Sequence, residues 1–98
     1  LLQVARRLLK SHDPKYRFQA VTVNKNHASA RHTDKYNRGP SYIIGLGDYT
    51  GGELVFEEGP YKGTHNIKNR WLKFKGDTPH YVKPFKGTRY TLVYYHWA

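Results

Sequence analysis

Residues 41–57, SYIIGLGDYTGGELVFE, contain two apolar runs separated by a glycine-rich turn. The runs 41–46 and 53–57 are rich in β-branched and aromatic residues, which favour strands. Three glycines and an aspartate within 47–52 favour a turn. The spacing predicts that 41–46 and 53–57 are the two strands of a hairpin. We therefore expect the chain to be built on antiparallel β-structure.

Short apolar runs and turns continue on both sides of this segment. Further strands are predicted at 18–23, 64–67, 71–75, 80–85 and 89–97. Residues 1–10 instead have apolar side chains at helical spacing, and Pro14 ends this helix because proline lacks an amide hydrogen. The apolar face of the helix is predicted at Leu1, Val4, Ala5, Leu8 and Leu9. One helix followed by about seven short strands indicates a β-sandwich or barrel, folded as a single domain over 1–98.

The composition excludes several kinds of site. The chain has no cysteine, so it can form neither a disulfide nor a thiolate metal site. It has no run of about 18 apolar residues and no signal-peptide pattern, so we expect no membrane partner and an intracellular location, in the nucleus or the cytoplasm. Because the chain begins on Leu1 and stops directly after an apolar strand, we expect it to be the core fragment of a longer polypeptide.

The net charge is the strongest compositional signal. Lys and Arg number 17 against 7 Asp and Glu, which gives a formal charge of +10 on 98 residues. Such an excess favours a polyanionic partner, most often nucleic acid, because clustered cations neutralise phosphates. A basic, solvated surface without such a partner is the alternative that charge alone leaves open.

A histidine and an aspartate two residues apart are the first candidates for chemistry. In extended backbone, residues i and i+2 point to the same side, so His32 and Asp34 can present a nitrogen and an oxygen to one cation. His80, which follows the turn 76–79, is the third candidate ligand. Two histidines and one carboxylate are typical of non-haem iron oxygenases, which leave metal positions open for a cosubstrate and dioxygen, whereas zinc favours a tetrahedral set. Taken alone, the pair at 32 and 34 could equally be a surface histidine beside a solvated aspartate.

Arg89 is a candidate for binding the carboxylate of a cosubstrate near these ligands. It follows His80 by nine residues, across a turn and onto the next predicted strand. An iron oxygenase that uses a dicarboxylic 2-oxo acid needs a cation at the far end of its pocket, and arginine binds a carboxylate bidentately. Without the other three residues, Arg89 would be interpreted as a surface arginine at a strand edge.

These residues together resemble the signature of the 2-oxoglutarate/Fe(II)-dependent dioxygenase superfamily. His-x-Asp at 32–34, the distal His80 and Gly-Thr-Arg at 87–89 carry the resemblance. Val-Asn-Lys-Asn at 23–26 and GPSYIIGLGDYTGGEL at 39–54 are most similar to the TET/JBP branch, whose members oxidise the methyl group of 5-methylcytosine or thymine in nucleic acid. The resemblance covers roughly residues 18–96.

The resemblance implies a fold, a metal and a cosubstrate. The fold would be mainly β, a double-stranded β-helix of the jelly-roll or cupin kind with one N-terminal helix. His32, Asp34 and His80 would hold iron(II), with 2-oxoglutarate and O2 as cosubstrates. Arg89 would anchor the distal carboxylate of 2-oxoglutarate, and Asn24 lies where a polar strand residue helps to hold it.

The resemblance also implies a nucleic-acid substrate, most readily methylated DNA. His96 is near the place of a base-contacting residue late in the last strand. It lies seven residues past Arg89, however, so in a regular strand it faces the other way and Tyr95 points inward instead. Basic residues that flank the expected mouth are predicted to contact phosphates: Lys35 and Arg38, together with Lys25, Arg31 and Lys62.

Two other functions stay open at this point. One is a 2-oxoglutarate dioxygenase with the same iron site that hydroxylates a protein side chain, as prolyl and lysyl hydroxylases do. The other is a non-catalytic basic β domain that binds nucleic acid without a metal.

Overall fold

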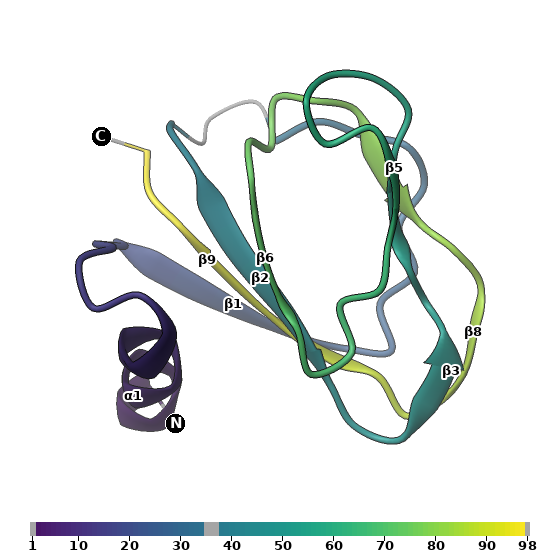
Figure 1. Ribbon diagram of the computed structural model, residues 1–98. Coiled ribbons are helices and arrows are strands. Elements are labelled where there is room, and N and C mark those ends of the chain that lie inside the picture. Colours follow the sequence, from purple (N-terminus) through teal and green to yellow (C-terminus); the bar gives the residue numbers. More distant parts are fainter. Residues whose placement is uncertain (1, 35–37, 98) are drawn as a thin grey trace.

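The computed structural model describes residues 2–34 and 38–97 (Figure 1). Within these residues the chain forms one helix and nine strands, and the paired strands are antiparallel. The prediction of a mainly β protein with an N-terminal helix is confirmed. In chain order the elements are α1 (Leu2–His12), β1 (Ala20–Lys25), β2 (Ser41–Leu46), β3 (Tyr49–Gly51), β4 (Leu54–Phe56), β5 (Gly63–His65), β6 (Trp71–Phe74), β7 (His80–Val82), β8 (Phe85–Gly87) and β9 (Tyr90–Tyr95).

The strands lie in two facing layers (Figure 1). One layer is a four-stranded sheet in the order β1-β9-β2-β6. The first and last strands of the chain are neighbours in it, with Ala20 opposite Tyr95 and Lys25 opposite Tyr90. The other layer is a three-stranded sheet in the order β5-β4-β7, and the β3–β8 ribbon lies at one end of the molecule.

The four-stranded sheet has apolar side chains on both faces. In β2, Tyr42 and Ile44 belong to a cluster that includes Ala5 and Leu9 of α1, whereas Ile43 belongs to a second cluster with residues of the opposite layer. Successive side chains of a strand point to opposite faces, so a strand covered on both sides is apolar without alternation. This explains the unbroken apolar run at 41–46.

α1 covers the outer face of this sheet (Figure 1). Ala5 and Leu9 are buried, and the Tyr94 hydroxyl donates a hydrogen bond to the carbonyl of Ala5 at 2.8 Å. Val4, predicted on the apolar face, is 63% exposed. Residues adjacent in sequence are about 100° apart around a helix, so the stripe through Ala5 and Leu9 turns Val4 away from the sheet. The helix also continues to His12, two residues beyond its predicted end.

The prediction that 41–46 and 53–57 form a hairpin is wrong. β2 pairs with β9 and β6, whereas β4 pairs with β5 and β7 in the other layer. The predicted turn between them contains β3, which pairs with β8. The predicted strand 80–85 likewise divides into β7 and β8. Turn residues mark a change of direction, but the packing of the layers selects the partner strand.

Candidate metal centre and its cavity

The backbone places the two histidines of the predicted triad side by side. His32 forms an isolated antiparallel bridge with His80, the first residue of β7. The amide of each donates a hydrogen bond to the carbonyl of the other, at 2.9 and 3.0 Å. The centroids of the two imidazole rings are 4.4 Å apart. Residues 48 positions apart in the sequence are thus held on the same side of one bridge.

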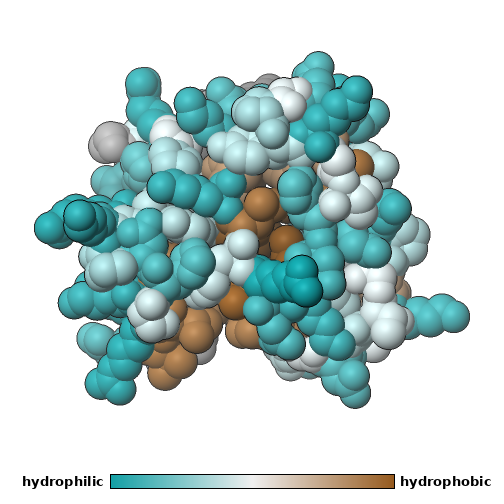
Figure 2. All heavy atoms as spheres, in the orientation of Figure 1, coloured by the Kyte–Doolittle hydropathy of each residue, from teal (hydrophilic) through white to brown (hydrophobic). Residues whose placement is uncertain are grey.

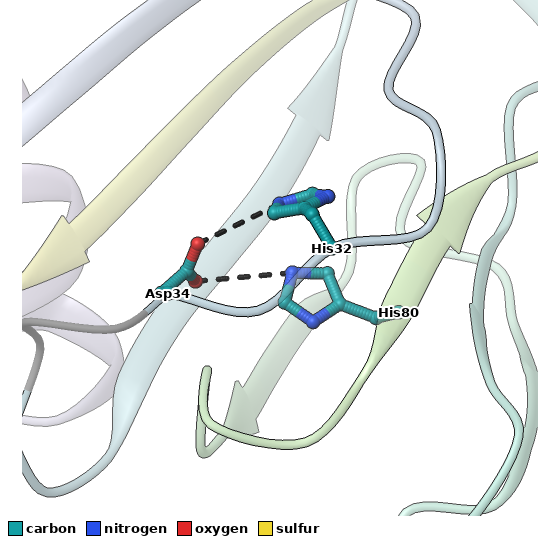
Figure 3. A group of neighbouring side chains, drawn as sticks. All are labelled: His32, Asp34 and His80. Carbon is teal, nitrogen blue, oxygen red and sulfur yellow. Dashed lines mark ion pairs between the residues drawn. The ribbon is translucent and has the colours of Figure 1, made fainter.

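Asp34 lies opposite both rings (Figure 3). Its Oδ1 is 3.5 Å from Nε2 of His32, and its Oδ2 is 3.8 Å from Nε2 of His80. One ligand atom from each of the three residues can be chosen so that all lie within 4.8 Å of one another. The two N–O distances are too long for good hydrogen bonds, which have separations of about 2.7–3.2 Å. They leave space between the three groups for an ion bound at about 2.0–2.2 Å from each.

Hydrogen bonds to the backbone set the tautomer of both histidines. Nδ1 of His32 lies 2.8 Å from the carbonyl oxygen of Ala30, and Nδ1 of His80 lies 2.7 Å from that of Thr78. A carbonyl oxygen only accepts, so these bonds assign the proton to Nδ1. In the neutral ring, Nε2 of each histidine then carries the lone pair, on the side that faces Asp34, and a lone pair in this position can bind a metal.

The centre is open on one side and closed on the other. His80 is buried and packs against the rings of Phe56 and Phe74, with centroid distances of 5.2 and 5.6 Å. The side chain of His32, by contrast, is 42% exposed, and that of Asp34 is 27% exposed. A ligand can therefore approach from the His32 side, while apolar rings exclude water behind His80.

Asp34 is held in place by a glycine that the sequence analysis did not single out. The amide of Asp34 donates to the carbonyl of Gly76 at 2.8 Å. A Cβ on Gly76 would overlap the side chain of Asp34. Gly76 was predicted only as part of a turn, because composition shows the turn but not the carboxylate packed against it.

The triad opens into a cavity of about 360 Å³ between the two layers. In Figure 2, apolar residues lie at the bottom of the opening between two hydrophilic halves of the molecule. The walls combine a polar set with aliphatic and aromatic side chains. The lining residues are Thr22, Asn24, His27, Ser29, His32, Asp34, Ile43, Leu54, Phe74, His80, Val82, Arg89, Thr91, Val93 and Tyr95.

Arg89 contributes a buried cation to the same cavity. It is 2% exposed, and one guanidinium nitrogen, Nη2, donates to the carbonyl of Gly52 at 3.0 Å. Its Nε has no hydrogen-bond partner, and no carboxylate in the described part of the chain lies within 4.0 Å of the group. Burial lowers the pKa of Arg89. A buried charge without a counter-ion is costly, so this position favours an anionic ligand.

Three further contacts fix the orientation of Arg89. The guanidinium carbon lies 5.7 Å from the ring centroid of Tyr49 and 5.5 Å from that of Phe85. The Arg89 amide donates to the side-chain oxygen of Asn26 at 2.8 Å. A Cβ on Gly52, whose φ is +69°, would come within 2.7 Å of Nε. The sequence analysis assigned Gly52 only to a turn, and nothing local in the sequence connects it with Arg89.

The other predicted site residues are distributed over both faces of the sheet. Asn24 lines the cavity, where its side-chain nitrogen donates to the hydroxyl of Thr91 at 3.4 Å. Tyr95 also lines the cavity. His96 does not, and lies instead in a hollow beside Tyr16 on the outer face, as the alternation of a regular strand requires.

The basic residues that were predicted at the mouth of the cavity and that the structure describes do not line the cavity. Arg38 is exposed, and its amide donates to the carbonyl of His96 at 2.8 Å. Arg31 forms an exposed ion pair with Glu57 at 3.0 Å, so part of its charge is neutralised. Lys35 lies outside the described residues.

The chain has no significant match among family models, curated proteins or solved structures. In the part of the chain that the structure describes, no helix is long and apolar enough to cross a bilayer.

Proposed function

We propose that this protein is the catalytic core of an iron(II)- and 2-oxoglutarate-dependent dioxygenase. The observation that carries the proposal is a single cavity lined both by His32, Asp34 and His80 and by the buried Arg89. A metal triad alone would also suit a hydrolase, and a buried arginine alone would suit many anions. Together they meet the needs of an enzyme whose cosubstrate is a dicarboxylate that must also reach a metal.

The strand order supports the double-stranded β-helix that such enzymes would use. Along the chain, β1, β2, β6 and β9 belong to one layer. The segment at His32, β4, β5 and β7 belong to the other, in the spatial order His32-β7-β4-β5. The chain thus crosses repeatedly between two antiparallel sheets, which is the arrangement of a jelly roll.

The donor set fits iron(II). Nε2 of His32, Nε2 of His80 and the Asp34 carboxylate would hold the ion on one face, with further positions open towards the cavity. When bound, iron(II) would supply the activation of dioxygen that couples the conversion of 2-oxoglutarate to succinate and carbon dioxide with the oxidation of a substrate C–H bond. Zinc can use the same donors, but a zinc hydrolase would give the buried Arg89 a role only if its substrate were an anion, whereas a dioxygenase of this class always needs an anionic cosubstrate.

The side chains of the cavity would position the cosubstrate. Arg89 would bind the distal carboxylate of 2-oxoglutarate, replacing the missing counter-ion of its guanidinium. Asn24 and Thr91 present polar groups to the same space, whereas Ile43 and Val93 exclude water from it. The protein's contribution is thus orientation and a dry pocket rather than acid–base catalysis.

For the substrate, we propose the methyl group of a 5-methylpyrimidine in nucleic acid, either 5-methylcytosine or thymine. The net charge of +10 supports a polyanion. The target base would leave the duplex to reach the cavity, at a cost of a few kcal/mol. Tyr95 is the aromatic residue that lines the cavity at the end of β9 and is our candidate contact for the base.

The first test is metal binding followed by turnover. Anaerobic calorimetry would measure iron(II) affinity, and succinate release would be measured with and without duplex DNA containing 5-methylcytosine. Asp34→Asn is expected to lower turnover by more than about 100-fold. Arg89→Lys should raise the KM for 2-oxoglutarate because it loses the bidentate contact. Asp48→Asn, which changes an exposed carboxylate that does not line the cavity, is the matched control.

The outcomes separate the candidate functions. Turnover that methylated DNA stimulates, and that Asp34→Asn abolishes, supports the full proposal. Turnover stimulated by a proline- or lysine-containing peptide instead keeps the enzyme class and replaces the substrate. If the protein binds no iron(II), the proposal fails, and DNA binding without a metal would leave a non-catalytic basic domain.

A further inference from the structure

The outer side of the molecule carries a cluster of cations away from the metal cavity. Two adjoining hollows share the lining residues Asp13, Tyr16, Arg17 and Phe18. One of them is completed by residues of α1, and the other by Pro40, Lys73 and His96. Six exposed cations line one or both hollows, and we call them the α1 surface: Arg6, Arg7, Lys10, Lys15, Arg17 and Lys73.

These cations have almost no acidic neighbours. None of the six forms an ion pair with a carboxylate of residues 2–34 or 38–97. Asp13 is the one acidic residue that lines either hollow. Its carboxylate accepts hydrogen bonds from the Tyr42 hydroxyl at 2.7 Å and from the amides of Lys15 and Tyr16 at 3.2 Å. The Asp13 carboxylate is thus held mainly by internal hydrogen bonds and attracts one of the six cations, Lys73, so most of the positive charge of the α1 surface is left for a partner.

Four of the seven acidic residues of the chain lie in the segment 48–58, which contains no Lys or Arg. Asp48, Glu53, Glu57 and Glu58 lie within the segment that contains β3 and β4, on the far side of the molecule from α1 (Figure 1). The molecule therefore has a basic side and a less basic side. Such a distribution orients a polyanion towards α1 rather than spreading it evenly over the surface.

We infer that the α1 surface binds the sugar-phosphate backbone of nucleic acid, at a site separate from the metal cavity. Its aromatic rings suit this partner, because Tyr16 and Phe18 lie among the cations and can contact sugars or bases. An anionic membrane is the less suitable partner. Leu2 and Val4 of α1 are exposed, but Ala5 and Leu9 are buried against the sheet, so the helix does not present a continuous apolar face that could enter a bilayer.

The end of β9 connects this surface with the cavity. Tyr95 lines the cavity and the next residue, His96, lines a hollow of the α1 surface. A strand of nucleic acid that reaches the cavity at Tyr95 can therefore continue past the end of β9 towards Lys15 and Arg17. This path deepens the proposed function, but binding by the α1 surface does not depend on the metal centre.

The test compares two triple variants of equal charge. In the first, Arg7, Lys10 and Arg17 are changed to Gln. In the control, Arg70, Lys83 and Lys86, which are exposed and lie outside both hollows, are changed to Gln. Affinity for duplex DNA is measured without iron or 2-oxoglutarate over a range of salt concentrations, and urea unfolding confirms that both variants are folded.

The salt dependence gives the expected size of the effect. If the six cations each neutralise one phosphate, log affinity for the wild type falls with log salt concentration with a slope of about −5. The first variant should flatten this slope by about 2.7 and weaken binding on the order of 100-fold at about 0.1 M salt. The control should keep both the slope and the affinity close to the wild type.

Three outcomes would overturn the inference. The first is an equal loss in both triple variants, which would mean that total charge alone matters. The second is wild-type affinity in the first variant. The third is a loss of binding to phosphatidylserine vesicles with DNA binding unchanged, which would assign the surface to a membrane. Because DNA affinity is measured without iron or 2-oxoglutarate, a failure of the dioxygenase proposal would not change the outcome of this test.

Discussion

The substitution Gly76→Ala should damage the metal centre without changing any of its ligands. A Cβ at this position would lie 2.7 Å from Cβ of Asp34 and 2.9 Å from its Cγ. Carbon atoms in contact are normally about 3.5 Å apart or more, so relief requires a displacement of about 0.8 Å. The hydrogen bond from the Asp34 amide to the Gly76 carbonyl, at 2.8 Å, opposes this displacement because it ties the two backbones together.

A metal site tolerates much less movement than this. Ligand distances in a working site are kept within about 0.2 Å, so the displaced carboxylate would bind the ion poorly. Changes to the residues that support metal ligands typically cost about 10–100-fold in affinity, and we expect Gly76→Ala to weaken iron(II) binding by that factor. The overlap should also destabilise the fold by about 1–3 kcal/mol, because it overpacks a buried position.

Gly63→Ala is the matched control. Gly63 has a φ of +131°, and a Cβ there would meet no atom within 4 Å. Its substitution strains the backbone by about 1–2 kcal/mol but touches no ligand. Calorimetric titration with iron(II) and urea unfolding would be measured on both variants. Equal metal affinity in Gly76→Ala and Gly63→Ala would refute the argument that Gly76 positions Asp34.

Three further predictions concern the cosubstrate, the helix and acid stability. Gly52→Ala should push against Arg89 and raise the KM for 2-oxoglutarate in the succinate assay, with kcat less affected; an unchanged KM would contradict this. Tyr94→Phe should cost about 1–2 kcal/mol in urea unfolding, because a buried carbonyl of α1 loses its donor. The Tyr42 hydroxyl holds the pKa of Asp13 below its usual 3.8, so Asp13 stabilises the fold above that value and this contribution is lost as the pH falls through the lowered pKa. Asp13→Asn should therefore weaken the acid dependence of the urea midpoint below about pH 4, and an unchanged dependence would argue against this role.

The sequence indicated the metal triad because two of its three ligands are only two residues apart. His32 and Asp34 share a side of the chain by strand alternation alone, which the structure reproduces. The preference for Tyr95 over His96 at the cavity followed from the same alternation. The third ligand was inferred from its setting after a turn, and only the bridge between His32 and His80 brings it to the other two.

The residues that support the site could not be predicted in this way. Gly76 and Gly52 were interpreted as turn glycines, yet each gives room to a side chain remote in the sequence, Asp34 and Arg89 respectively. The carbonyl oxygen of Thr78 orients the ring of His80, which is only two residues further along the chain. The local sequence nevertheless does not show that Nδ1 of His80 points towards this oxygen. Such contacts depend on side-chain directions that composition and spacing do not specify.

The sequence by itself determined the β-rich class, the N-terminal helix, the candidate ligands and the basic charge, because each depends on residue type and short-range period. The tertiary structure decided which strands pair: β2 and β4, neighbours in the chain, lie in different layers. It also decided that Arg89 is buried in the triad's cavity and that the unpaired cations gather beside α1. The physical reason is that pairing, burial and counter-ions are properties of contacts between distant segments, which form only when the two layers close on one another.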